Sequence, residues 1–128
     1  MDKYDPSIVP VPEEWLALPE DDRIDLVRLF HEKHEMELFE NGHMIAHAGI
    51  HVAVENQIAM ALEPVPATVA RLIRQGLSRH EAIHAVGAVL SDQIWEIQQK
   101  QQAKWDIGVY KRKLVKLTAK RWRKGKLK

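Results

Sequence analysis

Histidines are the residues of this chain whose spacing most clearly points to chemistry. The 128-residue sequence contains seven of them and no cysteine. His43, His47 and His51 are followed by Glu55 in a strict four-residue repeat. Four residues of a helix rotate by about 40° and rise about 6 Å, so these side chains form one slowly winding stripe. Adjacent members, such as His47 with His51 or His51 with Glu55, can chelate one metal ion, but the whole stripe is too tall for a single ion.

A second set of histidines forms the motif HExxH, with His80, Glu81 and His84. This spacing places two imidazoles on one helical face, and in zinc peptidases the glutamate between them is the general base. The peptidase pattern is incomplete, because Leu90 stands where one class has a third histidine and the only later glutamate lies on the same predicted helix. Glu81 also completes a capping box with Ser78. The motif therefore leaves Glu81 as either a general base or a helix-start residue, and it argues against peptidase activity.

Glu55 is the only formal charge in the segment 43–62, which is otherwise apolar on every side. A buried carboxylate needs a cation or several hydrogen bonds, and a metal ion or a protonated histidine would serve. The amide of Asn56 is a candidate for hydrogen bonds that orient metal ligands from outside.

His31 and His34 give two opposing signals. Their charged neighbours favour a surface position, but both continue an apolar row that begins at Ile24 and Val27, which favours the interior. Both histidines are left outside the predicted site.

The spacing of apolar residues predicts four main helices at about 19–39, 43–62, 67–75 and 78–104, after a proline-rich lead-in with one helical turn around Trp15. Asn41-Gly42 is typical of a helix end, and no alternating strand pattern is present. The predicted fold class is all-α, a small helical bundle of four main helices plus a basic C-terminal extension. We expect one helical domain over 1–108 and a partly helical basic tail over 109–128.

Two antiparallel helices about 8–10 Å apart would bring both histidine sets together. The predicted metal ligands are His47, His51, Glu55, His80 and His84, with Asn56 behind them. Without sulfur ligands, zinc is the first choice, with iron, manganese or nickel as alternatives. The leading hypothesis is a small helical metal-binding protein.

The charge of the chain is divided unevenly along its length. Ten of the 19 basic residues and none of the 18 acidic ones lie in 111–128, so this end carries +10 and the rest −9. The alternative hypothesis is a non-enzymatic interaction module, whose tail binds an acidic partner or nucleic acid while the His/Glu cluster is structural. The tail can instead pack on the acidic first helix of its own chain or of a second copy in a homo-oligomer. The predicted polyanion contacts are Lys111, Arg112, Lys113, Lys120, Arg121 and Arg123.

Composition and length favour a single soluble cytoplasmic domain. The chain is 45% apolar, which is enough for one core. No apolar run approaches the roughly 18 residues of a membrane span, and the N-terminus lacks the form of a signal peptide.

Three segments together resemble a family of small bacterial helical proteins known only as a domain of unknown function. They read PEEWLALPEDDRIDLVRLFH, HAGIHVAVENQIAM and RLIRQGLSRHEAIHAVGAVLSDQIW, and the resemblance covers about residues 12–98. It implies that the family shares the pattern residues His47, His51, Glu55, Asn56, His80, Glu81 and His84. No activity comes with the resemblance.

Overall fold

The structure is a computed structural model, and it describes residues 1–34, 41–100 and 104–125. Helices are the only regular secondary structure in these residues. The absence of strands from these residues confirms the all-α prediction. Seven helices are present in this part of the chain. In chain order they are α1 (Pro12–Ala17), α2 (Glu20–His34), α3 (Asn41–Ala59), α4 (Val65–Arg74), α5 (Arg79–Lys100), α6 (Ile107–Lys116) and α7 (Ala119–Arg123).

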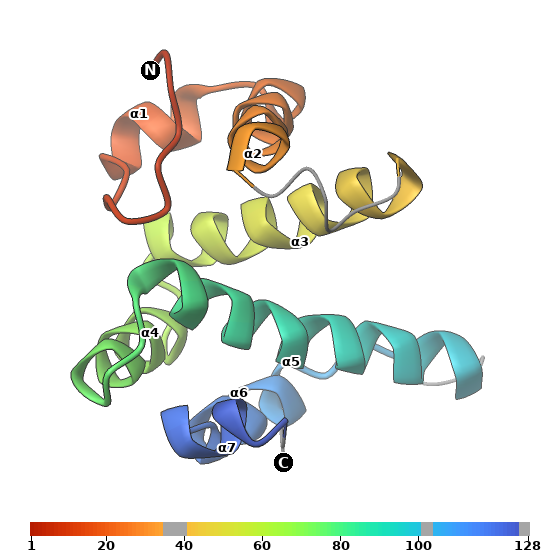
Figure 1. Ribbon diagram of the computed structural model, residues 1–128. Coiled ribbons are helices and arrows are strands. Elements are labelled where there is room, and N and C mark those ends of the chain that lie inside the picture. Colours follow the sequence, from red (N-terminus) through yellow and green to blue (C-terminus); the bar gives the residue numbers. More distant parts are fainter. Residues whose placement is uncertain (35–40, 101–103, 126–128) are drawn as a thin grey trace.

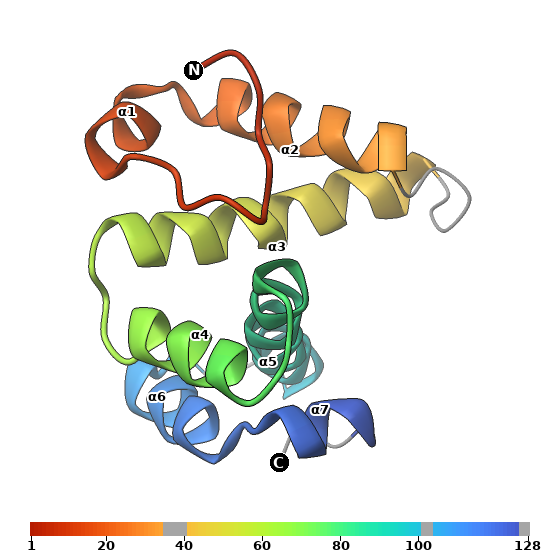
Figure 2. The ribbon, with the colours of Figure 1, turned by 60° about the vertical axis from the view of Figure 1, so that its left-hand side comes forward.

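The two longest helices, α3 and α5, cross each other in the middle of the molecule (Figure 1). Helices α1 and α2 pack on the side of α3 that faces away from α5, whereas α4 and α6 pack against α5 (Figure 1). After a 60° turn of the view, α3 is seen along its length and α5 nearly end-on (Figure 2). Side chains from α2, α3 and α5 can therefore meet where the two central helices cross.

Helix α3 separates two clusters of buried apolar side chains. One cluster combines Val54 with residues of α4, α5 and α6, including Leu72 and Ile83. The other joins Val52 to Trp15 and Val27, with Tyr4 from the lead-in. Because α3 contributes to both clusters, it must be apolar on all sides, as the sequence of 43–62 predicts.

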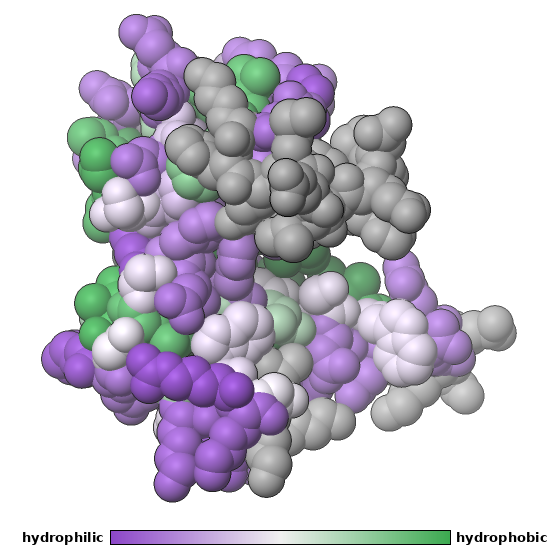
Figure 3. All heavy atoms as spheres, viewed as in Figure 1, coloured by the Kyte–Doolittle hydropathy of each residue, from purple (hydrophilic) through white to green (hydrophobic). Residues whose placement is uncertain are grey.

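The basic C-terminal segment packs on the body of the protein. Tyr110, Leu114 and Leu117 are fully buried in the cluster shared with α4 and α5. The Arg71 guanidinium donates to the carbonyls of Leu114 and Leu117, at 2.9 and 2.7 Å. Hydrophilic side chains gather over the α7 end of the face shown in Figure 3. The segment is therefore amphipathic, with an apolar side that belongs to the core.

Helix boundaries follow the sequence signals in part. Ser78 Oγ accepts a hydrogen bond from the Glu81 N–H at 3.1 Å, which is the predicted cap of α5. Asn41 and Gly42 were expected to end a helix, but they are the first residues of α3. The predicted ends of the 19–39 and 78–104 helices reach into 35–40 and 101–103, which lie outside the described residues. Among the described helices, none combines the length and apolar character that a membrane crossing requires.

Candidate metal centre

Five histidines from three helices converge where α2, α3 and α5 meet; we call them the histidine cluster. They are His31 of α2, His47 and His51 of α3, and His80 and His84 of α5. Candidate ligand nitrogens of His31, His51, His80 and His84 all lie within 4.8 Å of one another. The His47 Nε2 atom is 3.2 Å from the Nε2 atoms of both His31 and His84. The structure thus brings together the four predicted histidine ligands and adds His31.

A hydrogen bond determines which ring nitrogen of His31 carries the proton, and so which nitrogen offers a lone pair to the cluster. Its Nδ1 lies 2.8 Å from the carbonyl oxygen of Val27. A carbonyl only accepts, so Nδ1 carries the proton and donates. In the neutral ring, Nε2 is then unprotonated, and its lone pair is directed at His47. His31 is fully buried, so this lone pair has no access to bulk water.

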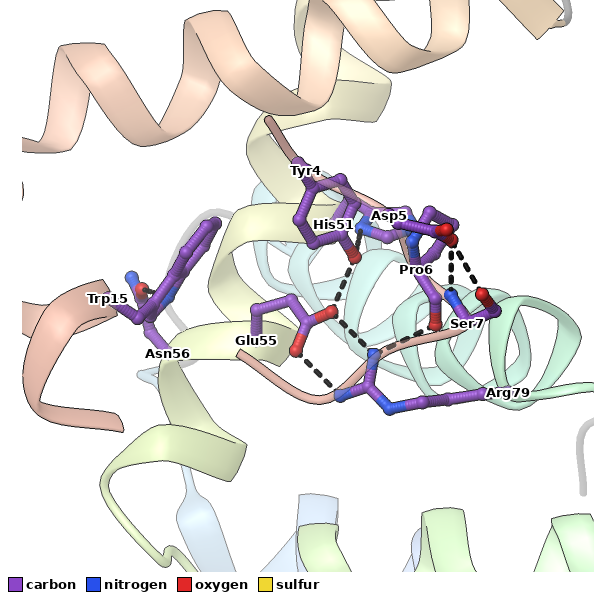
Figure 4. A network of polar contacts seen from close by, with 9 residues as sticks. All are labelled: Tyr4, Asp5, Pro6, Ser7, Trp15, His51, Glu55, Asn56 and Arg79. Atoms are coloured by element: carbon purple, nitrogen blue, oxygen red, sulfur yellow. Dashed lines mark hydrogen bonds and ion pairs between the residues drawn. The ribbon is translucent and has the colours of Figure 1, made fainter. Parts of the chain in front are cut away.

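A chain of hydrogen bonds likewise determines which ring nitrogen of His51 carries the proton (Figure 4). The Tyr4 hydroxyl donates to Glu55 Oε2, because an ionised carboxylate only accepts. The Tyr4 oxygen therefore accepts from His51 Nδ1–H at 3.1 Å. His51 Nε2 is buried and has no hydrogen-bond partner in the described structure. An unsatisfied buried acceptor of this kind costs about 1–3 kcal/mol, and a metal ion would satisfy it.

Glu55 lies behind the histidines instead of among them. The structure does not bring its carboxylate into the group of ligand nitrogens. Its two oxygens accept from the Arg79 guanidinium at 2.8 and 2.9 Å, and Arg79 also donates to the Pro6 carbonyl at 2.9 Å (Figure 4). Both side chains of the pair are almost fully buried. The cation that a buried Glu55 requires is thus Arg79, and Glu55 reaches the cluster through Tyr4.

Burial keeps the imidazoles of His47, His51 and His84 in their neutral, electron-donating form. Burial, followed by the nearby charges of His31 and His80, lowers the pKa of His47 to about 4. Burial, and then its neighbours His80, His47 and His31, lower the pKa of His84 to about 3. The pKa of His51 is also well below the usual value, mainly because of burial. At neutral pH these rings are therefore ready to act as ligands without first losing a proton.

For protein kept free of metal, we expect the free energy of unfolding to fall as the pH is lowered from about 7 to about 5. Unfolded histidines bind protons near pH 6.5, whereas His47, His51 and His84 remain neutral in the fold. The contribution of these histidines to the free energy of unfolding is therefore fully present above the pKa that histidine has in the unfolded chain. Below that pKa it declines by about 1.4 kcal/mol per pH unit for each such histidine. Urea denaturation across this range measures the slope, and His84→Ala should make it shallower. An unfolding free energy that does not change with pH would contradict the assigned charge states.

Asn56 and Glu81 lie apart from the ligand nitrogens. Asn56 Oδ1 accepts from Trp15 Nε1 and from the Arg23 guanidinium, both at 2.9 Å, so it fastens α1 and α2 to α3. Glu81 is exposed at the start of α5, where its backbone N–H donates to Ser78. The contact of Glu81 is the one expected of a residue at the start of a helix. The contacts of Asn56 give it a role in helix packing.

The basic residues proposed to contact polyanions are divided between two short helices. Lys111, Arg112 and Lys113 lie on α6, and Lys120, Arg121 and Arg123 lie on α7. Lys113 is within 3.5 Å of Glu96, and the Arg123 guanidinium sits over Gly76, where a Cβ atom would come within 3.0 Å of it. Arg112, Lys120 and Arg121 are exposed. Polyanion binding by this surface stays a prediction.

Three residues that the sequence analysis did not place in the site support it directly: His31, Tyr4 and Arg79. For His31 a signal existed, because the apolar row through Val27 pointed inward. For Arg79 the signal was the need of Glu55 for a cation. Tyr4 had no signal, since it lies in the proline-rich lead-in. The side chains of His34 and His43 lie outside what the structure describes.

Comparison with known proteins places the chain in a family. The family described as a domain of unknown function, DUF1841, matches residues 27–116, so the chain belongs to it. This confirms the resemblance to a domain of unknown function, although the matched range begins and ends later than the 12–98 expected. No curated protein and no solved structure matches the chain.

Proposed function

We propose that this member of the DUF1841 family binds one divalent transition metal ion through its histidine cluster. The observation that carries the proposal is the convergence of four histidines whose ligand atoms lie within 4.8 Å of one another. Histidines scattered in a core pack singly against apolar groups, whereas these five face one another across three helices. One shared cation would satisfy several inward-facing lone pairs at once.

The spacing of the nitrogens suits a metal ion. Zinc–nitrogen bonds are about 2.0–2.1 Å, so two nitrogens of one tetrahedral zinc lie about 3.3 Å apart. The two Nε2 contacts of His47, each 3.2 Å, are close to that separation. Metal-bound histidines also commonly donate their second ring N–H to a carbonyl or to a carboxylate-linked group. His31 donates to Val27, and His51 donates to Tyr4 and so connects to Glu55.

The donor set narrows the choice of metal. Among the residues that the structure describes, only imidazole nitrogens form the group. Imidazole suits zinc, copper, nickel and iron, whereas manganese prefers carboxylate oxygens. A single ion is favoured over a pair, because no carboxylate of the described residues joins the group to offset the repulsion between two dications. Zinc remains the first choice.

Calorimetric titration of the metal-free protein with zinc is expected to show one ion per chain. Because the imidazoles of His47 and His84 are already neutral at pH 7, the binding heat should hardly depend on the ionisation enthalpy of the buffer. Tyr4→Phe removes the acceptor of His51 Nδ1–H and should weaken zinc binding by about 10–100-fold.

Tyr110→Phe is the matched control. Tyr110 is equally buried, and its hydroxyl donates to Gln57 Oε1 at 2.6 Å in the other core cluster. It should bind zinc as the unmodified protein does. If the unmodified protein takes up no zinc, copper, nickel or iron, the cluster is a structural hydrogen-bond network and the interaction-module hypothesis takes precedence.

A further inference from the structure

An apolar pocket opens directly onto one side of the histidine cluster. Its volume is about 340 Å³, and His47, His51 and His84 form one wall. The other walls include Ile50 of α3 and Ile83 of α5. The fully buried His31 is absent from the lining, so the pocket reaches the cluster from the side of His47 and His84.

The C-terminal segment supplies another wall of the pocket. Trp122 of α7 belongs to the lining, and it also packs against the core shared by α4, α5 and α6. Gly87 of α5 lies close to α3, because a Cβ atom there would come within 3.0 Å of Ile50 Cγ2. The pocket is therefore built from the central helix crossing together with α7.

The chemistry of the lining restricts what the pocket accepts. Among the described lining residues none is acidic, and neither lysine nor arginine is present. Apart from the histidines and the indole of Trp122, the only polar side chain is the hydroxyl of Ser91. A phosphorylated or multiply charged ligand would lose its hydration here without gaining a counter-charge. The volume falls within the range of about 300–1,000 Å³ that small-molecule sites occupy.

We propose that the pocket binds a small uncharged molecule with an apolar body and a single nitrogen or oxygen donor, which ligates the metal from the side of His47 and His84. This inference rests on the proposed metal centre. The body of the ligand lies against Ile50, Ile83 and Trp122, and its donor atom takes the coordination position that faces the pocket. Four histidine nitrogens fill a tetrahedral site, so the outside ligand enters as an additional donor and the metal expands to five-coordinate.

Protein loaded with cobalt(II) tests the proposal, since visible absorption of cobalt reports on its coordination. The probes are imidazole, which supplies a donor alone, and 4-phenylimidazole, which adds an apolar body. We expect 4-phenylimidazole to change the cobalt spectrum and to bind at least about tenfold more tightly than imidazole, because its ring is buried in the pocket.

Two variants locate the effect in the pocket. Ala88→Phe fills the pocket, and Trp122→Ala removes one wall; each should retain cobalt and lose most of the preference for 4-phenylimidazole. Ala70→Phe, at an exposed position on α4 outside the lining, is the matched control and should keep the preference. Cobalt uptake by each variant verifies that the helices have folded around the cluster.

The outcomes separate the two proposals. If cobalt binds but the two probes have equal affinities, or if both pocket variants keep the preference, the pocket proposal is wrong and the metal centre stands. If the unmodified protein takes up no cobalt, zinc, copper, nickel or iron, the metal centre is wrong and the ligand proposal falls with it.

Discussion

Replacing His51 and His84 together by alanine is expected to abolish zinc binding. Each histidine offers a nitrogen to the same group, from α3 and from α5 respectively. Loss of a hydrogen-bond partner behind a ligand typically weakens metal binding by 10–100-fold, so loss of two ligands should weaken it by at least about 10³-fold. Zinc at a hundred times its dissociation constant should stabilise the unmodified protein by about 2.7 kcal/mol and raise its melting temperature. The double variant should show no such rise.

The control for this experiment is Glu81→Gln. Glu81 lies between two histidines of the HExxH motif, yet its side chain is exposed. We expect this variant to bind zinc with unchanged affinity and to melt at the usual temperature. Zinc binding by the double variant that matched the unmodified protein would place the ion elsewhere. Loss of binding in Glu81→Gln would instead point to a peptidase-like arrangement of the motif.

Glu55→Gln is expected to destabilise the metal-free protein by about 3–5 kcal/mol. Glu55 and Arg79 form a buried, bidentate ion pair, with side chains 1% and 7% exposed. The substitution leaves the guanidinium buried without a counter-charge, and it also removes the carboxylate to which Tyr4 donates. Urea denaturation in the presence of a chelator measures the change separately from metal binding.

Two further variants test whether the lost charge is the cause. Glu32→Gln breaks the Arg28–Glu32 pair at 3.0 Å, but both side chains are more than a third exposed, so the loss should be under about 1 kcal/mol. Combining Glu55→Leu with Arg79→Met removes both charges and should recover most of the stability. A Glu55→Gln variant as stable as Glu32→Gln would contradict the buried pair.

Most of the cluster could be predicted from spacing within single helices. His47 and His51, like His80 and His84, are four residues apart, and a helix places such pairs on one face whatever the rest of the fold does. That α3 would lie at the centre also followed from the sequence, because a helix that is apolar on every side must be covered on every side.

The remaining contacts depend on how segments distant in the sequence meet. Tyr4 contacts His51 and Glu55 across 47 and 51 residues of sequence, and its segment has no helical pattern. The charged residues beside His31 suggested water, but His31 follows Val27 into the core. The sequence implied that a buried Glu55 needs a cation and suggested a metal ion or a protonated histidine, but it did not identify Arg79. Trp122 likewise lies in a strongly basic stretch, and its spacing from Leu117 did not show which helices it would pack against.

X-ray absorption spectroscopy of the zinc-loaded protein tests the central claim most directly. It measures the type, number and distance of the atoms bound to the metal. We expect nitrogen ligands only, at about 2.0–2.1 Å, with the outer scattering of at least three imidazole rings. A first shell of mainly oxygen atoms without imidazole scattering, or a protein that retains no zinc, would contradict the assignment of the histidine cluster as a metal centre.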